Sequence, residues 1–162
     1  TPEIEELVGK EIDTFVKAHT HYGEYNPRVT DGIHVFDSCF DVSRGGTARV
    51  LTIRNSTVTS VSGNSVVHHI CENSFVGIID EQAVVCNVIG TADSYETKNK
   101  ELGHSVIIDT VADSAIIGNA VCTNIRVIKN NAKVSDMALS YVMKLDDSAI
   151  VKRAINTQFG EM

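Results

Sequence analysis

Residues 64–88 read NSVVHHICENSFVGIIDEQAVVCNV, and one short pattern occurs in them three times at a spacing of nine residues. Each copy begins with a small residue (Ser65, Ser74 or Ala83), has a valine two positions later and has isoleucine or valine five positions later. Asn64 and Asn73 stand directly before the two serines. Asparagine tolerates the left-handed backbone of a tight turn, and valine and isoleucine favour strands. The stretch therefore predicts short strands joined by tight corners.

The pattern extends over residues 47–154, with a period of nine residues in most units and eight in a few. Its eleven units start at Ala48, Ser56, Ser65, Ser74, Ala83, Ser105, Ser114, Thr123, Ala132, Ser140 and Ser148. Two positions later, all eleven residues are β-branched: Val50, Val58, Val67, Val76, Val85, Ile107, Ile116, Ile125, Val134, Val142 and Ile150. Five positions after the start, eight of the eleven residues are apolar, and the exceptions are Thr110, Asn119 and Arg153. We expect the β-branched column to lie in the interior.

A short, constant period of turn and strand is typical of a solenoid, whose units bury their apolar faces only against one another. We therefore predict a mostly β protein, a β-solenoid with a repeat of about nine residues. Two units per coil would form a flattened roll with two sheets. We favour this roll over a three-sided helix and over an antiparallel sandwich. The Gly-Gly-x-Gly-x-Asp turn of calcium-binding rolls is absent, so we predict no calcium.

Residues 1–162 are expected to form a single domain. It should contain an N-terminal helix over 1–19, an irregular first coil over 20–46, the solenoid over 47–154 and a tail over 155–162. Thr1 and Pro2 are typical of a helix start. The apolar residues of this segment recur at helical spacing: Ile4, Leu7, Val8, Ile12, Phe15 and Val16. We interpret the amphipathic helix as a cap on the open end of the solenoid, with a dimer or partner helix as the alternative.

The chain has a net charge of −7, four cysteines and no apolar run long enough to cross a bilayer. No signal peptide opens the sequence, so we expect a soluble cytoplasmic protein. Cys39, Cys71, Cys86 and Cys122 form no C-x-x-C pair. We expect reduced, packed thiols rather than a disulfide framework or a zinc site.

The sequence contains no phosphate-binding loop, no G-x-S-x-G and no H-E-x-x-H. His19 and His21, together with His34 or Glu24, could ligate a metal ion. Histidines in loops are more often solvated, so we predict no metal site, no cofactor and no catalytic residue. An enzyme is therefore not the favoured interpretation.

One set of candidate binding residues lies in the polar segment 91–103, which interrupts the repeat and should project from the stack as a loop. Its candidates are Asp93, Tyr95, Glu96, Lys98 and Lys100. A second set makes the C-terminal end basic, because residues 124–153 contain six bases and three acids, whereas residues 1–47 contain nine acids and four bases. These bases are Arg126, Lys129, Lys133, Lys144, Lys152 and Arg153. Such a surface could bind nucleic acid or an acidic protein.

The C-terminal end of the stack has no predicted capping helix. An open solenoid end exposes strand edges and ladder residues, so we expect two copies to meet there end to end as a homodimer. The candidate dimer residues are Val142, Leu145, Ile150, Ile155 and Phe159.

Residues 55–61 (NSTVTSV) and 64–67 (NSVV) resemble the Asn-Ser-Thr-Val type repeats of phage, mobile-element and bacterial surface proteins. The resemblance implies a β-solenoid and assigns no functional residue. Our leading hypothesis is a non-enzymatic protein that binds a macromolecule, such as a small phage or mobile-element inhibitor or adaptor of a host protein. One alternative is a nucleic-acid binder that uses the basic C-terminal end, and another is a carbohydrate-active enzyme with a site in a groove. We expect no membrane partner.

Overall fold

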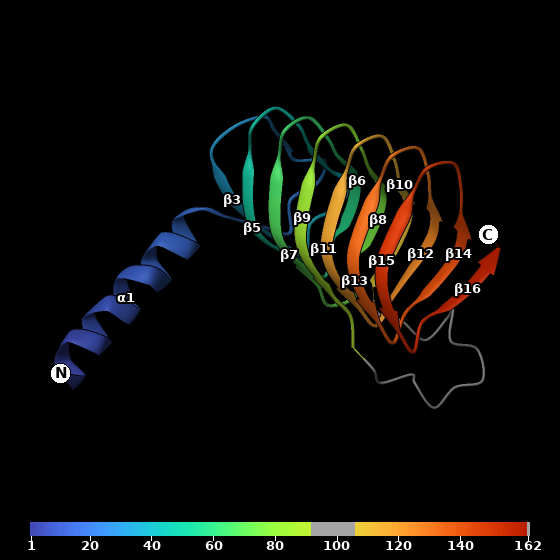
Figure 1. Cartoon of the computed structure of the whole chain (residues 1–162). Helices are drawn as coiled ribbons and strands as arrows, with labels where there is room; N and C mark the ends of the chain where they lie inside the picture. Colours follow the sequence, from blue (N-terminus) through green and yellow to red (C-terminus); the bar gives the residue numbers. More distant parts are fainter. Residues whose placement is uncertain (92–105, 162) are drawn as a thin grey trace.

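The computed structural model describes residues 1–91 and 106–161, which form one helix and sixteen strands. Consecutive strands alternate between two eight-stranded parallel sheets that face each other (Figure 1). Each coil therefore contributes one strand to each sheet. The prediction of a β-solenoid with two units per coil is confirmed.

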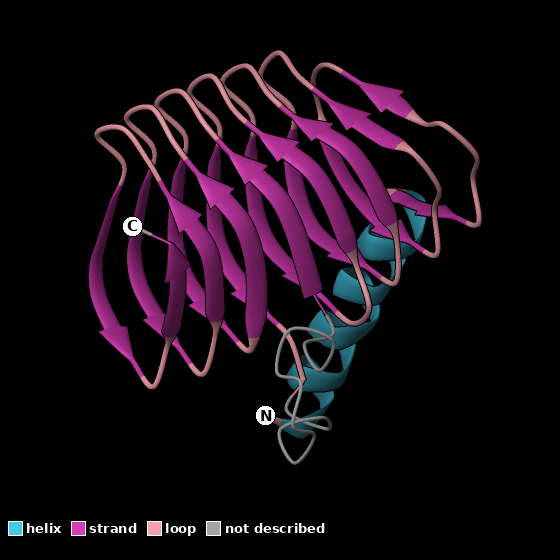
Figure 2. Ribbon diagram, turned by 90° about the vertical axis from the view of Figure 1, so that its right-hand side faces the viewer, coloured by secondary structure: helices cyan, strands magenta, loops and turns pink. Residues whose placement is uncertain are grey.

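The odd-numbered strands form one sheet, in the order β1 (Thr20–Tyr22), β3 (Ile33–Asp37), β5 (Arg49–Arg54), β7 (Val66–Cys71), β9 (Val84–Ile89), β11 (Ile116–Val121), β13 (Lys133–Ala138) and β15 (Ile150–Ile155). The even-numbered strands form the other sheet, in the order β2 (Arg28–Val29), β4 (Val42–Arg44), β6 (Thr57–Val61), β8 (Phe75–Ile79), β10 (Val106–Val111), β12 (Thr123–Ile128), β14 (Tyr141–Leu145) and β16 (Gln158–Glu161). Val50 lies beside Val67, and Val67 beside Val85, so equivalent positions in these successive coils are 17 or 18 residues apart. Figure 2 shows the coils stacked along one axis.

The corners follow from the residues that the sequence places there. An asparagine or aspartate directly before the small residue has φ between 48° and 57° in four units: Asn55, Asn73, Asp113 and Asp147. Asn64 does not, because its neighbour Gly63 takes the left-handed conformation instead (φ 68°). Asparagine and aspartate adopt this left-handed conformation at low cost. After Asn55 and Asn73 the small residue that follows, Ser56 or Ser74, is buried. After Asp113 and Asp147 that serine is exposed, and the alanine behind it, Ala115 or Ala149, packs against the core instead. The hydrogen bonds of Ser56 illustrate the buried case. Its Oγ donates to the carbonyl of Arg54 (2.8 Å) and accepts from the N–H of Cys39 in the preceding coil (3.0 Å).

The predicted interior column is confirmed in eight of the eleven units. Its residues in these units are at most 2 % exposed: Val50, Val58, Val67, Val76, Val85, Ile125, Val134 and Val142. They stack in register from coil to coil and form continuous apolar ladders inside the roll.

The predicted column is wrong by one residue in the units that we started at Ser105, Ser114 and Ser148. Ile116 and Ile150 are 38 % and 45 % exposed, and Ile107 is only half-buried. Their neighbours occupy the interior instead: Ile108 and Ile117 are fully buried, and Val151 packs against the core. Two adjacent β-branched residues occur at each of these positions, so the sequence pattern satisfies either frame. Thr110, Asn119 and Arg153 broke the apolar pattern five positions after the unit start because the frame of these three units began one residue too early.

The helix α1 (Pro2–Ala18) forms where the sequence predicts it, and Oγ1 of Thr1 accepts from the N–H of Ile4 at its first turn. No residue of α1 is buried, and the helix runs away from the first coil (Figure 1). The expectation that it caps the stack is therefore wrong. An apolar helix face needs an apolar end to pack on, whereas the first coil ends in polar side chains, as described below.

Regular strands continue beyond the predicted bounds 47–154. Strands β1 to β4 belong to the same two sheets, and β16 pairs with β14 where we expected a tail. The excursion 91–103 lies, except for Thr91, outside the described residues.

The four cysteines are free thiols; Cys39 and Cys122 are buried, and Cys71 and Cys86 are half-buried. Burial raises the pKa of the thiols of Cys39, Cys71 and Cys122. The prediction of packed thiols is confirmed. No helix in the described ranges is long and apolar enough to cross a membrane.

Candidate functional site at the N-terminal end of the solenoid

Three of the interior ladders carry a polar residue near the N-terminal end of the stack. In the strand register, His34 continues the column of Val50, His21 continues that of Phe36, and Arg44 continues that of Val61. Polar groups at interior positions are costly unless they are hydrogen-bonded. The first two coils therefore depart from the pattern that stabilises the rest of the solenoid, and we treat them as the candidate site.

A chain of hydrogen bonds links two of these residues to the loops beside them. Oε2 of Glu24 lies 2.6 Å from Nδ1 of His21, and Nε2 of His21 lies 2.9 Å from Nδ1 of His34. Nε2 of His34 lies 2.7 Å from the carbonyl oxygen of Asp31. The chain thus joins the β1–β2 loop, strand β1, strand β3 and the β2–β3 loop.

The outer contacts of this chain fix where the ring protons are. The carbonyl of Asp31 can only accept, so His34 carries its proton on Nε2. An ionised Glu24 also only accepts, so His21 carries its proton on Nδ1. In neutral rings, the remaining nitrogens, Nε2 of His21 and Nδ1 of His34, would then hold lone pairs that face each other at 2.9 Å. The two ring nitrogens are thus oriented towards each other by the contacts on the opposite side of each ring.

Packing holds both imidazoles in place. The ring of His21 stacks on Phe36, with the ring centroids 4.7 Å apart, and the centroid of His34 lies 6.0 Å from that of Phe36. Phe36 is fully buried. The thiol of Cys39 donates to the carbonyl of His21 (3.1 Å) and so ties the backbone of β1 to the next coil. The two rings are therefore oriented by the core and by hydrogen bonds at once.

Arg44 is the most unusual interior residue. Its side chain is 2 % exposed, and none of its three guanidinium nitrogens has a hydrogen-bond partner among the described residues. Burial lowers its pKa well below the ordinary value of arginine, to about 10, so the group stays charged at neutral pH. An unpaired buried charge is strongly destabilising.

Helix α1 leaves this same end of the stack with its apolar residues in solvent. The stripe residues are between 43 % and 60 % exposed: Ile4, Leu7, Val8, Ile12 and Phe15. Below, "stripe" means these five residues. Val16, at the base of the helix, is only half-buried.

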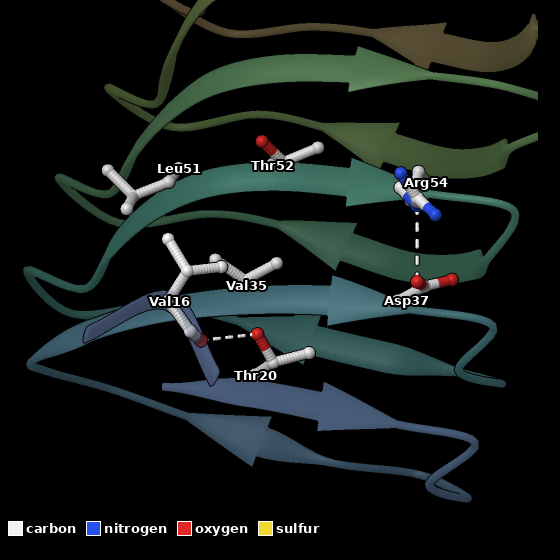
Figure 3. A pocket seen from close by; sticks show the side chains of 7 residues that line it. All are labelled: Val16, Thr20, Val35, Asp37, Leu51, Thr52 and Arg54. Carbon is white, nitrogen blue, oxygen red and sulfur yellow. Dashed lines mark hydrogen bonds and ion pairs between the residues drawn. The ribbon is translucent and has the colours of Figure 1, made fainter. Parts of the chain in front are cut away.

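A groove of about 470 Å³ lies between the base of α1 and the outer face of β3 and β5 (Figure 3). Val16, Val35 and Leu51 give it an apolar part, whereas Asp37 and Arg54 form an ion pair at its other end (3.1 Å). The hydroxyl of Thr20 donates to the carbonyl of Val16 and fixes the turn between helix and strand (Figure 3).

The structure brings together only some of the residues that the sequence suggested. His21, Glu24 and His34 meet, but the ring of His19 stacks on Phe15 instead, with 4.1 Å between centroids. No group of three or more His, Cys, Asp or Glu side chains suited to a metal ion occurs among the described residues. Asp93, Tyr95, Glu96, Lys98 and Lys100 lie outside the described residues.

The basic residues of the C-terminal half do not gather on one face. Arg126 and Lys144 belong to the even-numbered sheet, Lys133, Lys152 and Arg153 belong to the odd-numbered sheet, and Lys129 follows β12. Three of them pair with aspartates: Arg126 with Asp109 (3.3 Å), Lys144 with Asp146 (3.6 Å) and Arg153 with Asp136 (2.6 Å). Their positive charge is therefore partly neutralised.

The residues suggested for a C-terminal dimer differ in accessibility. Val142 is fully buried in β14, so it cannot contact a second copy. Leu145 and Phe159 are partly buried against the core, whereas Ile150 and Ile155 are 45 % and 67 % exposed. Dimerisation through this end stays a prediction.

Sequence reasoning missed Arg44 as a site residue. The strand register is irregular between His34 and Val35 and between Val42 and Ser43, and this shifts the first coils out of the nine-residue frame.

Comparison with known proteins adds no assignment, since no family model, curated protein or solved structure matches the chain.

Proposed function

We propose that this chain is a non-enzymatic binding protein whose β-solenoid presents α1 as a docking element to a protein partner. The observation that carries the proposal is the stripe on α1, which no other part of the described chain covers. Apolar surface left in water costs roughly 25 cal/mol per Å². An amphipathic helix gains this energy when it binds in an apolar groove. The stacked coils provide a rigid base for the helix.

Charge favours a different protein over a second copy as the partner. Five acids and two bases lie in α1, which gives the helix a net charge of −3. Glu11 follows Val8 by three positions and precedes Phe15 by four, so it lies within the stripe. A parallel pair of copies would place one Glu11 against the other, and an anionic membrane would repel the helix. We therefore assign the stripe to a protein groove with lysine or arginine opposite Glu11.

Two other functions have weaker support. Nucleic-acid binding needs a continuous basic surface, but the basic residues lie on both sheets and half of them pair with aspartates. A glycosidase needs two carboxylates across a groove. The groove beside α1 is lined by one carboxylate, Asp37, and that group pairs with Arg54.

A photo-crosslinking amino acid tests the proposal in the full-length chain. Placed at Val8 it should capture a partner from cells of the native host, whereas placed at Asp13, on the opposite side of the helix, it should not. The captured protein is then purified and titrated with the wild type and with Val8→Asp, Glu11→Lys and the control Asp13→Asn. We expect at least tenfold weaker binding for the first two variants and no change for the control. An adaptor or inhibitor role would follow from the partner's own activity in the complex.

Two results would overturn this function. One is a captured protein that binds Val8→Asp as tightly as the wild type. The other is a wild-type dimer in light scattering that Val8→Asp converts to a monomer, because the stripe would then bind a second copy.

A further inference from the structure

We propose that His21 and His34 bind a late first-row transition-metal ion such as Zn²⁺ between Nε2 of His21 and Nδ1 of His34. This inference concerns the first two coils, and its evidence does not depend on the role assigned to α1. Imidazole nitrogens suit Zn²⁺, Cu²⁺ and Ni²⁺, whereas Ca²⁺ and Mg²⁺ prefer oxygen ligands.

The hydrogen bonds around the two rings are those that metal-binding histidines have. A ligating histidine donates its second N–H to a carboxylate or a backbone carbonyl, which fixes the tautomer and orients the lone pair. Here Nδ1 of His21 faces the carboxylate of Glu24 (2.6 Å), and Nε2 of His34 faces the carbonyl of Asp31 (2.7 Å). Both second contacts are present, and the two remaining nitrogens point at each other. The site therefore offers two oriented imidazole ligands on neighbouring strands.

The spacing requires only a small movement. Two nitrogens bound to tetrahedral Zn²⁺ at about 2.0–2.1 Å lie about 3.3 Å apart. The present separation is 2.9 Å, so the two nitrogens would have to move apart by about 0.4 Å. His21 lies in the first strand of its sheet, so no further strand restrains it on its outer side. Water would occupy the remaining positions around the ion.

Other groups near the rings support two ligands rather than three. The thiol of Cys39 is directed at the carbonyl of His21 and not at a ring nitrogen. The carboxylate of Asp37 pairs with Arg54. The carboxylate of Glu24 contacts Nδ1 of His21, and its negative charge would offset part of the positive charge of an ion bound at Nε2 of the same ring.

Isothermal titration of metal-free protein with Zn²⁺ tests the site. We expect one ion per chain and no binding of Mg²⁺. His21→Gln and His34→Gln should abolish binding, whereas the control variants His68→Gln and His69→Gln on β7 should keep it. Glu24→Ala should weaken binding by about tenfold or more, and Glu24→Gln should restore part of the loss, because the amide oxygen still accepts from Nδ1 of His21.

A measurement on the wild type covers the case in which a histidine variant fails to fold. In a nitrogen-15 spectrum of the histidine rings, Zn²⁺ should shift Nε2 of His21 and Nδ1 of His34 and leave the rings of His68 and His69 unchanged. Absence of Zn²⁺ binding, binding that survives both His21→Gln and His34→Gln, or shifts confined to other histidines would each overturn the proposal.

Discussion

Replacing Arg44 with methionine should stabilise the protein. The substitution removes a charge that is 2 % exposed and has no hydrogen-bond partner among the described residues, and it leaves a flexible apolar side chain in the same column as Val61. Burial lowers the pKa of Arg44 from its ordinary value to about 10. This difference corresponds to a cost of about 3 kcal/mol for the charged form in the folded state. The free energy of unfolding should therefore rise by about that amount.

The effect has a defined pH dependence. Because the folded-state pKa of Arg44 lies below its ordinary value, the cost is fully present below a pH of about 10 and decreases as the pH rises from there towards the ordinary pKa of arginine. The gain from Arg44→Met should therefore be largest at neutral pH and shrink above pH 10. For a chain of this length, about 3 kcal/mol corresponds to roughly 6–12 °C in Tm.

Urea denaturation at neutral pH, followed by circular dichroism, measures the change. Two variants serve as controls: Val61→Arg, on the next rung of the same column, should destabilise by several kcal/mol, and Arg126→Met, on the surface, should change stability by less than about 1 kcal/mol. If Arg44→Met is as stable as the wild type or less stable, Arg44 has a compensating partner in solution, and the reasoning from an unpaired charge is refuted.

Three further predictions test the fold and its ends. Ile117→Asp should unfold the protein because it buries a charge. Ile116→Asp changes the neighbouring exposed residue and should lower the free energy of unfolding by less than about 1 kcal/mol in the same urea titration. An equal loss of stability in both variants would contradict the corrected frame. Gly118→Ala should destabilise the fold by about 1–3 kcal/mol, because the added Cβ would lie 2.6 Å from the carbonyl oxygen of Cys86. The Cβ added by Gly9→Ala in α1 meets nothing within 4 Å, so this variant should raise helix stability by roughly 1 kcal/mol. Thermal melts of both glycine variants decide this point, and a harmless Gly118→Ala would show that neighbouring coils can move apart. For the predicted C-terminal dimer, light scattering should find a dimer that Ile155→Lys dissociates, and a wild-type monomer at high concentration would exclude it.

The regular coils were predictable because their corners and ladders obey local rules. Asparagine or aspartate adopts the left-handed turn, a small residue fits behind it, and a β-branched residue follows on the interior side. The frame failed only where these signals were duplicated. Ser114 and Ala115 are both small, and Ile116 and Ile117 are both β-branched, so the local pattern could not say which of each pair lies inside. Burial in the folded coil decides between them.

The N-terminal site was not predictable in the same way. His21 and His34 meet because strands β1 and β3 pair in parallel, and this register does not follow from a sequence period. Arg44 was missed because the register of β4 against β6 shifts between Val42 and Ser43, just after Asp41 with its φ of 55°. The nine-residue count therefore no longer identifies the interior positions. The capping prediction failed for a related reason, since it assumed that the ladders stay apolar to the end of the stack.

The helix and the histidine pair are linked through a short stretch of chain. Nδ1 of His19 donates to the carbonyl of Phe15 (2.8 Å), and Thr20 donates to the carbonyl of Val16, so the base of α1 is tied to the start of β1. His21 is the next residue, and its position is set by the contact with His34. An ion held between these two rings would therefore fix β1 more firmly to β3 and reduce the freedom of α1 at its base. A partner that binds the stripe would then lose less conformational entropy, and by reciprocity its binding would strengthen that of the ion.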